Sequence, residues 1–269
     1  MKIVVIGGTG LIGSKLVNKL REHGHEAVAA SPNTGVNTLT GEGLADVLKG
    51  TSVVVDVSNS PSFEETAAMN FFNTATRNLI QYGQSAGVQH YVALSVVGTD
   101  RLAERMPSDA EKTIRGYFRA KLAQEKLIKE SSIPFSIVHA TQFFEFVKSI
   151  ADASSDGTTI RVAPILIQPM AADDVAAAVG RVAVGSPANR IVEVGGPEQF
   201  RLDEFIQQGL RTHNDPRKVV ADPAAGYFGV EVNERSLVPG KDARLGEIRF
   251  GTWLAQSAKS TAGATVTSR

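Results

Sequence analysis

Short apolar runs alternate with longer amphipathic segments through the first half of the chain. Residues 2–6 form a β-branched run, and residues 11–23 then repeat apolar side chains at Ile12, Leu16 and Leu20, which is helical spacing. Further strands are expected at residues 26–30, 52–57, 90–94 and 135–139, and further helices at residues 41–48, 65–86 and 114–130. Strands separated by helices predict an α/β fold with a Rossmann-type, doubly wound parallel sheet covered on both faces.

The pattern loosens after about residue 150. Short strand-like and helical runs continue to about residue 210, but residues 215–249 are rich in Gly and Pro and predict long loops. We therefore expect a first domain over residues 1–150 and a smaller, loop-rich substrate lobe over residues 151–255, partly interleaved with the first. Residues 256–269 are small and polar, which is typical of a disordered tail.

Charge and composition narrow the possible functions. The 28 basic and 28 acidic residues balance without a dense basic block, so neither nucleic acid nor a membrane is expected as a partner. Cysteine is absent, and the neighbouring His23 and His25 lack carboxylates at ligand spacing, so no metal site is expected. No apolar run approaches the roughly 18 residues of a membrane span and no signal peptide is visible, so we expect a cytoplasmic protein.

A glycine cluster joins the first expected strand to the first expected helix. Gly7 permits a sharp turn, Gly10 leaves room for a pyrophosphate against the backbone, and Gly13 lets the helix pack close to the sheet. The helix N-terminus adds free N–H groups and partial positive charge. This context favours a dinucleotide site over a merely structural turn. The expected cofactor-binding residues of the cluster are Gly7, Thr9, Gly10, Leu11, Ile12 and Gly13.

The end of the second expected strand bears on which dinucleotide binds. A carboxylate usually accepts the ribose 2′-hydroxyl of NAD there, but residues 29–34 contain none, and they contain no arginine for a 2′-phosphate. Ser31 and Asn33 could hydrogen-bond a phosphate together with Thr34, and Lys15 could reach it. We therefore expect NADP(H) as the cofactor, with NAD(H) as the alternative. The same residues could also simply cap a turn.

Other strand ends supply further candidates, because ligands bind at the carboxyl edge of a parallel sheet. Asp56 and Ser58 follow the third expected strand and Thr141 follows the strand at 135–139, so all three are expected to contact the cofactor, although Asp56 could equally cap a turn. Residues 99–112 could form a lid or a solvated loop. The expected substrate-pocket residues are Val97, Gln142, Phe143 and Phe146, although core packing explains most phenylalanines.

Three residues indicate catalysis. Tyr117 and Lys121 are four positions apart in an expected helix and share one face. A tyrosine acts as a general acid or base near neutrality when its pKa falls from about 10, and a neighbouring ammonium favours that change. Ser95 comes directly after the strand at 90–94, where its hydroxyl could hydrogen-bond a substrate carbonyl. A surface tyrosine beside a solvated lysine is the alternative, but the order of these residues after the glycine cluster favours a catalytic site.

Five segments together resemble the short-chain dehydrogenase/reductase superfamily, in its extended or atypical branch and close to the NmrA-like group. They are residues 7–13 (GGTGLIG), 92–98 (VALSVVG), 117–121 (YFRAK), 133–138 (IPFSIV) and 168–176 (QPMAADDVA). The resemblance covers residues 1 to about 210. It implies that Tyr117 donates the proton, that Lys121 also binds the nicotinamide ribose, and that Ser95 orients the substrate.

Two features bear on what the resemblance implies. The NmrA-like group includes NADP-binding members that lack the tyrosine and act as redox-sensing regulators, so Tyr117 favours chemistry here. Position 139 is His where many relatives carry Arg.

The leading expectation is an NAD(P)H-dependent oxidoreductase that moves hydride to or from a small carbonyl or alcohol substrate. The alternatives are an NADP(H)-sensing regulator that acts through a protein partner, and a nucleotide-sugar epimerase or dehydratase. The oligomeric state stays open.

Overall fold

A computed structural model describes residues 1–104, 115–212 and 214–266 of the chain. Its main sheet contains the strands β1 (Lys2–Ile6), β2 (Glu26–Ala30), β3 (Val53–Asp56), β4 (His90–Val96), β5 (Phe135–Ala140), β8 (Ile191–Gly195) and β11 (Arg244–Leu245). They lie in the order β11-β8-β5-β4-β3-β1-β2, and every neighbouring pair is parallel. The Rossmann-type α/β fold expected from the sequence is confirmed.

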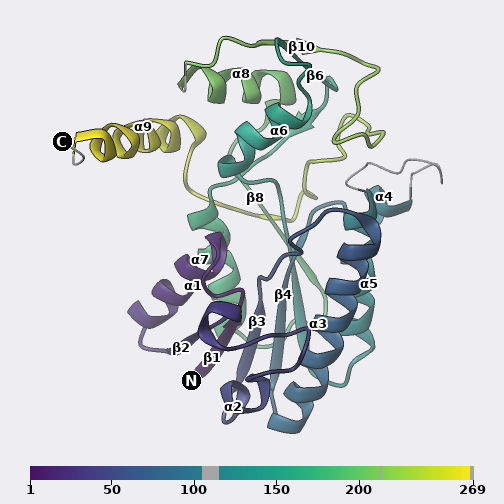
Figure 1. Cartoon of the computed structure of the whole chain (residues 1–269), viewed down its shortest axis with the longest axis vertical. Coiled ribbons are helices and arrows are strands. Elements are labelled where there is room, and N and C mark those ends of the chain that lie inside the picture. Colours follow the sequence, from purple (N-terminus) through teal and green to yellow (C-terminus); the bar gives the residue numbers. More distant parts are fainter. Residues whose placement is uncertain (105–114, 213, 267–269) are drawn as a thin grey trace.

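Helices cover both faces of this sheet (Figure 1). One face carries α1 (Leu11–Glu22) and α7 (Ala172–Val184); the other carries α2 (Leu44–Leu48), α3 (Glu65–Ala86) and α5 (Arg115–Glu130), which the short α4 (Thr99–Glu104) precedes. Successive strand residues point to opposite faces, so Val5 packs with Leu16 of α1 while Val4 packs with Leu79 of α3. Burial on both faces explains why these strands read as nearly continuous apolar runs.

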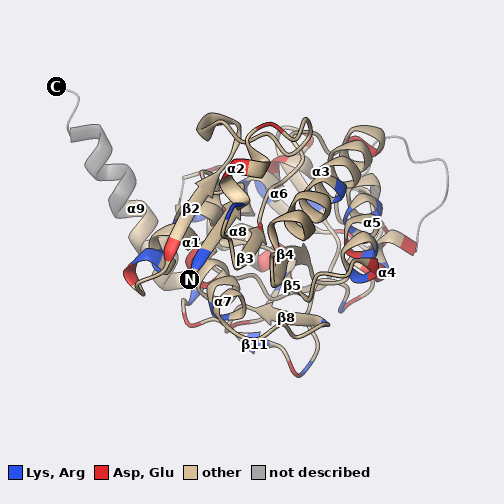
Figure 2. Ribbon diagram, turned by 90° about the horizontal axis from the view of Figure 1, so that it is seen from below, with Lys and Arg blue, Asp and Glu red and all other residues tan. Residues whose placement is uncertain are grey.

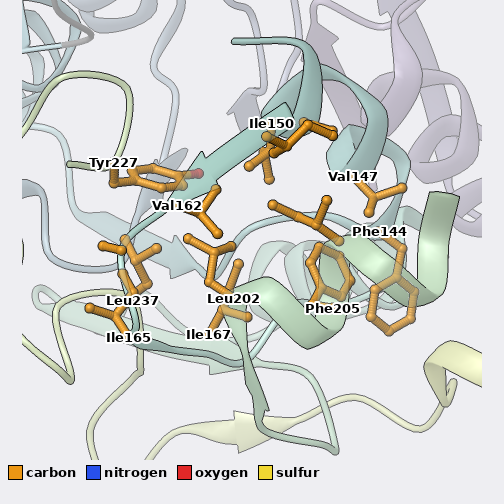
Figure 3. Packing of buried hydrophobic residues seen from close by; sticks show 14 of the residues in the cluster. Phe144, Val147, Ile150, Val162, Ile165, Ile167, Leu202, Phe205, Tyr227 and Leu237 are labelled. Atoms are coloured by element: carbon orange, nitrogen blue, oxygen red, sulfur yellow. The ribbon is translucent and has the colours of Figure 1, made fainter. Parts of the chain in front are cut away.

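A second lobe lies beyond the carboxyl edge of the sheet (Figure 1). It contains η2 (Phe144–Phe146), α6 (Val147–Ala153), β6 (Thr159–Val162), β7 (Leu166–Ile167), β9 (Phe200–Arg201), α8 (Leu202–Thr212) and β10 (Lys218–Ala221). Its core is built around buried side chains such as Phe144, Ile167 and Phe205 (Figure 3). Within residues 151–255, α7, β8 and β11 return to the main sheet, so the two lobes share this stretch of chain.

The C-terminal helix α9 (Phe250–Val266) differs from the sequence expectation. A disordered tail was expected from residue 256, whereas the helix continues through Val266; residues 267–269 lie outside the described part of the chain. Phe250 is fully buried in the second-lobe core and stacks with Trp253 at a ring-centroid distance of 5.9 Å. This docking fixes the first turns, and the alanines that follow favour continuation of a helix once it has started.

Charged residues of both signs are spread over the molecule, and both signs occur along α5 (Figure 2). Among the residues that the structure describes, no helix combines the length and the hydropathy needed to cross a bilayer.

Candidate functional site

The glycine cluster forms the turn between β1 and α1 at the carboxyl edge of the sheet. Gly7 has a φ of +75°, and its N–H donates to the Ala30 carbonyl at the end of β2 over 2.9 Å. A methyl group on Gly13 would overlap the Gly7 carbonyl oxygen, and one on Gly8 would overlap the Ala29 backbone. Only glycine therefore fits at positions 7, 8 and 13 of this turn, which brings the N-terminus of α1 close to the sheet edge.

The expected cofactor-binding residues at the start of α1 differ in their exposure to solvent. Thr9, Gly10 and Leu11 are exposed at the turn. Gly10 precedes the helix without a side-chain cap, so the first N–H groups of α1 are left for water or a ligand. Ile12 is buried in the core under α1, and it can offer a ligand only its backbone.

The end of β2 carries a buried hydroxyl without a partner. Ser31 is 6% exposed, and its Oγ makes no hydrogen bond within the described residues. Asn33 follows in η1 (Pro32–Thr34) and is exposed. Lys15, which was expected to be able to reach a 2′-phosphate here, instead forms an ion pair with Asp173 of α7 at 2.8 Å.

Asp56 at the end of β3 is a saturated acceptor. Its Oδ1 accepts from the Ser58 N–H at 3.0 Å and the Ser58 hydroxyl at 2.6 Å, which closes the turn after the strand. Its Oδ2 accepts from the Tyr91 hydroxyl at 3.3 Å and from Gln124 Nε2 at 2.9 Å. The structure thus gives Asp56 the turn-capping role that the sequence left as an alternative, and it also ties Asp56 to α5.

Lys121 points into this polar network. It is 2% exposed, and its Nζ donates to the Leu94 carbonyl of β4 at 2.8 Å and to Gln124 Oε1. The ammonium also lies 4.5 Å from the Phe72 ring centroid. Burial lowers the pKa of Lys121 to about 8, against the opposing charges of Asp56 and Glu125.

Tyr117 lies one turn before Lys121 on α5, as expected, but its surroundings are apolar. Its ring contacts those of Phe63, Phe72 and Phe118 at centroid distances of 5.3, 5.8 and 5.9 Å. Burial raises the pKa of Tyr117 above its ordinary value. The expectation that Lys121 lowers this pKa is therefore corrected, because the ammonium is directed to Leu94 and Gln124 and the phenol stays protonated.

The Ser95 hydroxyl is engaged with a carboxylate that the sequence analysis missed. Ser95 Oγ donates to Glu125 Oε1 at 2.6 Å, His139 Nε2 lies 2.8 Å from the same oxygen, and Lys129 Nζ lies 3.2 Å from Oε2. Burial alone would raise the pKa of Glu125, but the hydrogen bonds from His139 and Ser95 and the charge of Lys129 lower it to about 2. A serine has one hydroxyl proton, so Ser95 cannot donate to a substrate carbonyl while this bond exists.

A helical-face pattern would have revealed these partners. Gln124 and Glu125 follow Tyr117 at seven and eight positions, so with Lys121 they occupy one face of α5. That face lies against the carboxyl ends of β3 and β4.

Residues after β5 divide into buried polar groups and aromatic rings. Thr141 Oγ1 and Gln142 Oε1 are buried without a hydrogen-bond partner in the described chain. Phe143 packs on the core under α1 and α7 and stacks with Phe146 at 5.4 Å, while Phe146 is 44% exposed. Val97 is completely buried in the turn after β4, so the expectation that its side chain lines a substrate pocket is corrected.

The expected lid and the expected substrate pocket remain to be placed. The expected lid at residues 99–112 begins as helix α4, and its residues 105–112 lie outside the described residues. A hollow of about 510 Å³ lies between residues 163–165 and the loop at residues 223–234. None of the expected pocket residues lines it.

The carboxyl edge fits a dinucleotide. Close backbone packing at Gly7, Gly8 and Gly13 forms the turn, and exposed Gly10 leaves it without a side chain at the start of α1. Ser31, Thr141 and Gln142 hold unpartnered buried polar atoms at the ends of β2 and β5. A buried polar atom is rarely left without a hydrogen bond in a native protein, so these three atoms are available to a ligand or to ordered water at the sheet edge.

Comparisons with known proteins agree with this geometry. Residues 7–182 match the family described as NAD(P)H-binding. The photosystem II assembly factor Ycf39 of Synechocystis sp. is 24% identical over 247 residues, which is 84% of this chain and 72% of that protein. The 3-beta-hydroxysteroid dehydrogenase of Mycolicibacterium neoaurum is 31% identical over 112 residues, which is 34% of this chain and 31% of that protein. The structure of MoeE5 in complex with UDP-glucose and NAD has a TM-score of 0.72 at 19% identity, covers 98% of this chain and 100% of its own, and shows a shared fold.

Proposed function

This chain belongs to the NAD(P)H-binding family, and on that premise we propose that it is an oxidoreductase that uses NADP(H) to reduce a small carbonyl compound. The observation that carries the proposal is the position of the Tyr117 phenol on α5, because Lys121 one turn later ties this helix to the end of β4, at the same sheet edge as the glycine turn. One of its relatives is named as a dehydrogenase, which supports the same class of activity.

The glycine turn would hold the pyrophosphate of the cofactor, and Ser31 would face its adenosine ribose. The backbone N–H groups at the start of α1 suit the pyrophosphate because they are uncapped and lie at the positive end of the helix. Ser31 suits a 2′-phosphate because it supplies a hydroxyl donor without a negative charge. Thr141 and Gln142 would supply the polar contacts at the end of β5. When bound, a reduced nicotinamide supplies a hydride.

Tyr117 would supply the proton. Its pKa is raised by burial, so the phenol is protonated at every ordinary working pH. Such a group can donate to a carbonyl oxygen that is becoming an alkoxide, but it is a poor base for an alcohol. The state of Tyr117 therefore favours carbonyl reduction over alcohol oxidation. Lys121 would act by holding α5 against β4 through the Leu94 carbonyl, with its charge balanced by Asp56 and Glu125.

A redox-sensing regulator is the second candidate, and one observation favours it. Lys121 is turned inward to Leu94 and Gln124, and Ser95 donates to Glu125, so neither side chain is directed toward a substrate. The relative with the greater coverage is named as an assembly factor, which fits a role through a protein partner.

Cofactor titration and a single substitution test the proposal. We expect saturable binding of NADPH by fluorescence and turnover of carbonyl compounds that depends on Tyr117. Tyr117→Phe should lower kcat by a factor of about 10² to 10⁴, the usual contribution of a positioned proton donor, with NADPH affinity unchanged. Tyr82→Phe is the matched control, because Tyr82 lies at the far end of α3 near Gly41 and its loss should leave kcat unchanged.

Three results would contradict the proposal at different levels. A chain that binds neither NADPH nor NADH would refute the cofactor assignment. Binding without turnover on a broad carbonyl panel would favour the regulator. Turnover that survives Tyr117→Phe at the same rate would remove Tyr117 from the chemistry.

A further inference from the structure

Two pairs of aromatic rings, each with one exposed member, lie at the carboxyl edge of the sheet. Phe63, in the loop after β3, is 53% exposed and meets Tyr117 edge to face at 5.3 Å. Phe146, in the segment after β5, is 44% exposed and stacks on Phe143 at 5.4 Å. Since β3 and β5 both neighbour β4 in the sheet, the two loops leave the same edge on either side of the end of β4.

Each exposed ring is supported by a ring that the core holds in place. Tyr117 packs against Phe72 of α3 at 5.8 Å, on the face covered by α3 and α5. Phe143 packs into the core of the opposite face, under α1 and α7. Phe63 and Phe146 thus each present a flat apolar ring that is held by a packed neighbour. The neighbour is Tyr117 on the α3 and α5 face for Phe63, and Phe143 on the α1 and α7 face for Phe146. Ordered aromatic surface of this kind binds another ring by stacked or edge-to-face contact.

The charges beside these rings are negative or already neutralised. Glu64 follows Phe63 and accepts from the Thr66 and Ala67 N–H groups, which lowers its pKa and keeps it ionised. Glu65 comes next and forms an ion pair with Arg119 at 3.0 Å. On the other side, Glu145 precedes Phe146 and accepts from the Ala172 N–H at the start of α7, and burial raises its pKa. A diphosphate or carboxylate ligand beside Phe63 would meet the Glu64 charge unfavourably, since like charges repel.

We propose that the substrate is an uncharged carbonyl compound whose carbonyl group is attached to a flat unsaturated ring. This inference rests on the proposed reductase function and specifies its substrate class. The ring contacts Phe63 and Phe146, and the carbonyl oxygen faces the Tyr117 phenol. The carbonyl carbon gains a hydride, and so two electrons, from the reduced nicotinamide, while the oxygen takes the Tyr117 proton. The products are an alcohol and the oxidised nicotinamide, and the phenolate regains its proton from solvent.

A matched set of probes tests the ring and the charge separately. Acetophenone carries the ring and its carbonyl, cyclohexyl methyl ketone replaces the ring by a saturated one, and UDP-glucose adds a diphosphate. Binding is measured by calorimetry on the full chain loaded with NADP⁺, and turnover is measured with NADPH. We expect acetophenone to bind about tenfold more tightly than the saturated ketone, because two ring contacts each contribute a few-fold in affinity. We expect UDP-glucose not to compete.

Leucine substitutions keep apolar bulk and remove the rings. Phe63→Leu and Phe146→Leu should each reduce the preference for acetophenone by about threefold without lowering stability, since both side chains are about half exposed. Leu245→Ala, an exposed apolar side chain on β11 at the edge of the sheet, is the control and should leave the preference unchanged.

The outcomes separate this inference from the reductase function. Ring-selective binding that depends on Phe63 and Phe146, without turnover of any probe, would refute the reductase function and keep the ring site. The inference is overturned if acetophenone does not bind, if both ketones bind with equal affinity, or if UDP-glucose competes. It is also overturned if both leucine variants retain the preference for acetophenone. Each of these results counts even if another carbonyl compound is reduced.

Discussion

Replacing Glu125 by glutamine isolates the charge at the centre of the buried Ser95–Glu125–His139 cluster. Glutamine has nearly the shape of a protonated glutamate, so the variant reproduces the acid form of the side chain at every pH. A pKa that falls from 4.5 to about 2 on folding corresponds, at 1.36 kcal/mol per pH unit, to about 3 kcal/mol of stability from the ionised form. The free energy of unfolding of the wild-type chain should therefore exceed that of Glu125→Gln by about 3 kcal/mol at neutral pH.

The sign of the pH dependence follows from the lowered pKa. The unfolded carboxyl binds its proton below about pH 4.5, whereas the folded carboxyl resists protonation until about pH 2. The stability that Glu125 contributes is fully present above about pH 5 and is lost as the pH falls toward 2. The difference between wild type and variant should shrink over the same window, because both side chains are then neutral.

Urea unfolding at a series of pH values between 2 and 7 measures this difference. Glu130→Gln is the matched control on the same helix, because Glu130 is exposed and 3.9 Å from Lys126, and such a pair contributes less than about 1 kcal/mol. The reasoning is refuted if Glu125→Gln unfolds like the control at pH 7, or if the difference between wild type and Glu125→Gln does not change from pH 5 to pH 2.

Three further substitutions or titrations follow from the structure. Gly13→Ala should abolish NADPH binding and destabilise the fold by about 1–3 kcal/mol, because its methyl group meets backbone; Gly251→Ala, which meets nothing within 4 Å, should bind normally in the same titration. Ser31→Asp should weaken NADPH while sparing NADH, and unchanged NADPH affinity would remove Ser31 from the 2′-phosphate site. Burial lowers the pKa of His90 to about 4, so stability should fall as the pH drops from about 6.5 to 4, and NMR titration of the His90 ring with a midpoint near 6.5 would contradict this.

The sequence by itself determined the elements and the glycine turn, because both depend on neighbouring residues. Helical spacing located α3 at Glu65–Ala86 without error, and the apolar run at residues 2–6 located β1. Gly7 was expected to turn sharply, and it has the positive φ that such a turn requires. Local spacing also placed Tyr117 and Lys121 on one helical face.

Only the tertiary structure decided where the polar side chains of that face bind. Ser95 and Glu125 are 30 residues apart, and Gln124 and Asp56 are 68 apart, so the register of α5 against β3 and β4 brings them together. This register made Glu125 the acceptor of the Ser95 proton and directed the Lys121 ammonium to the Leu94 carbonyl and Gln124. Likewise, α9 is a helix whose first turns are fixed by Phe250 in a core made by distant segments. Spacing along a chain fixes the direction of a side chain from its own backbone, whereas hydrogen-bond partners depend on how separate elements pack.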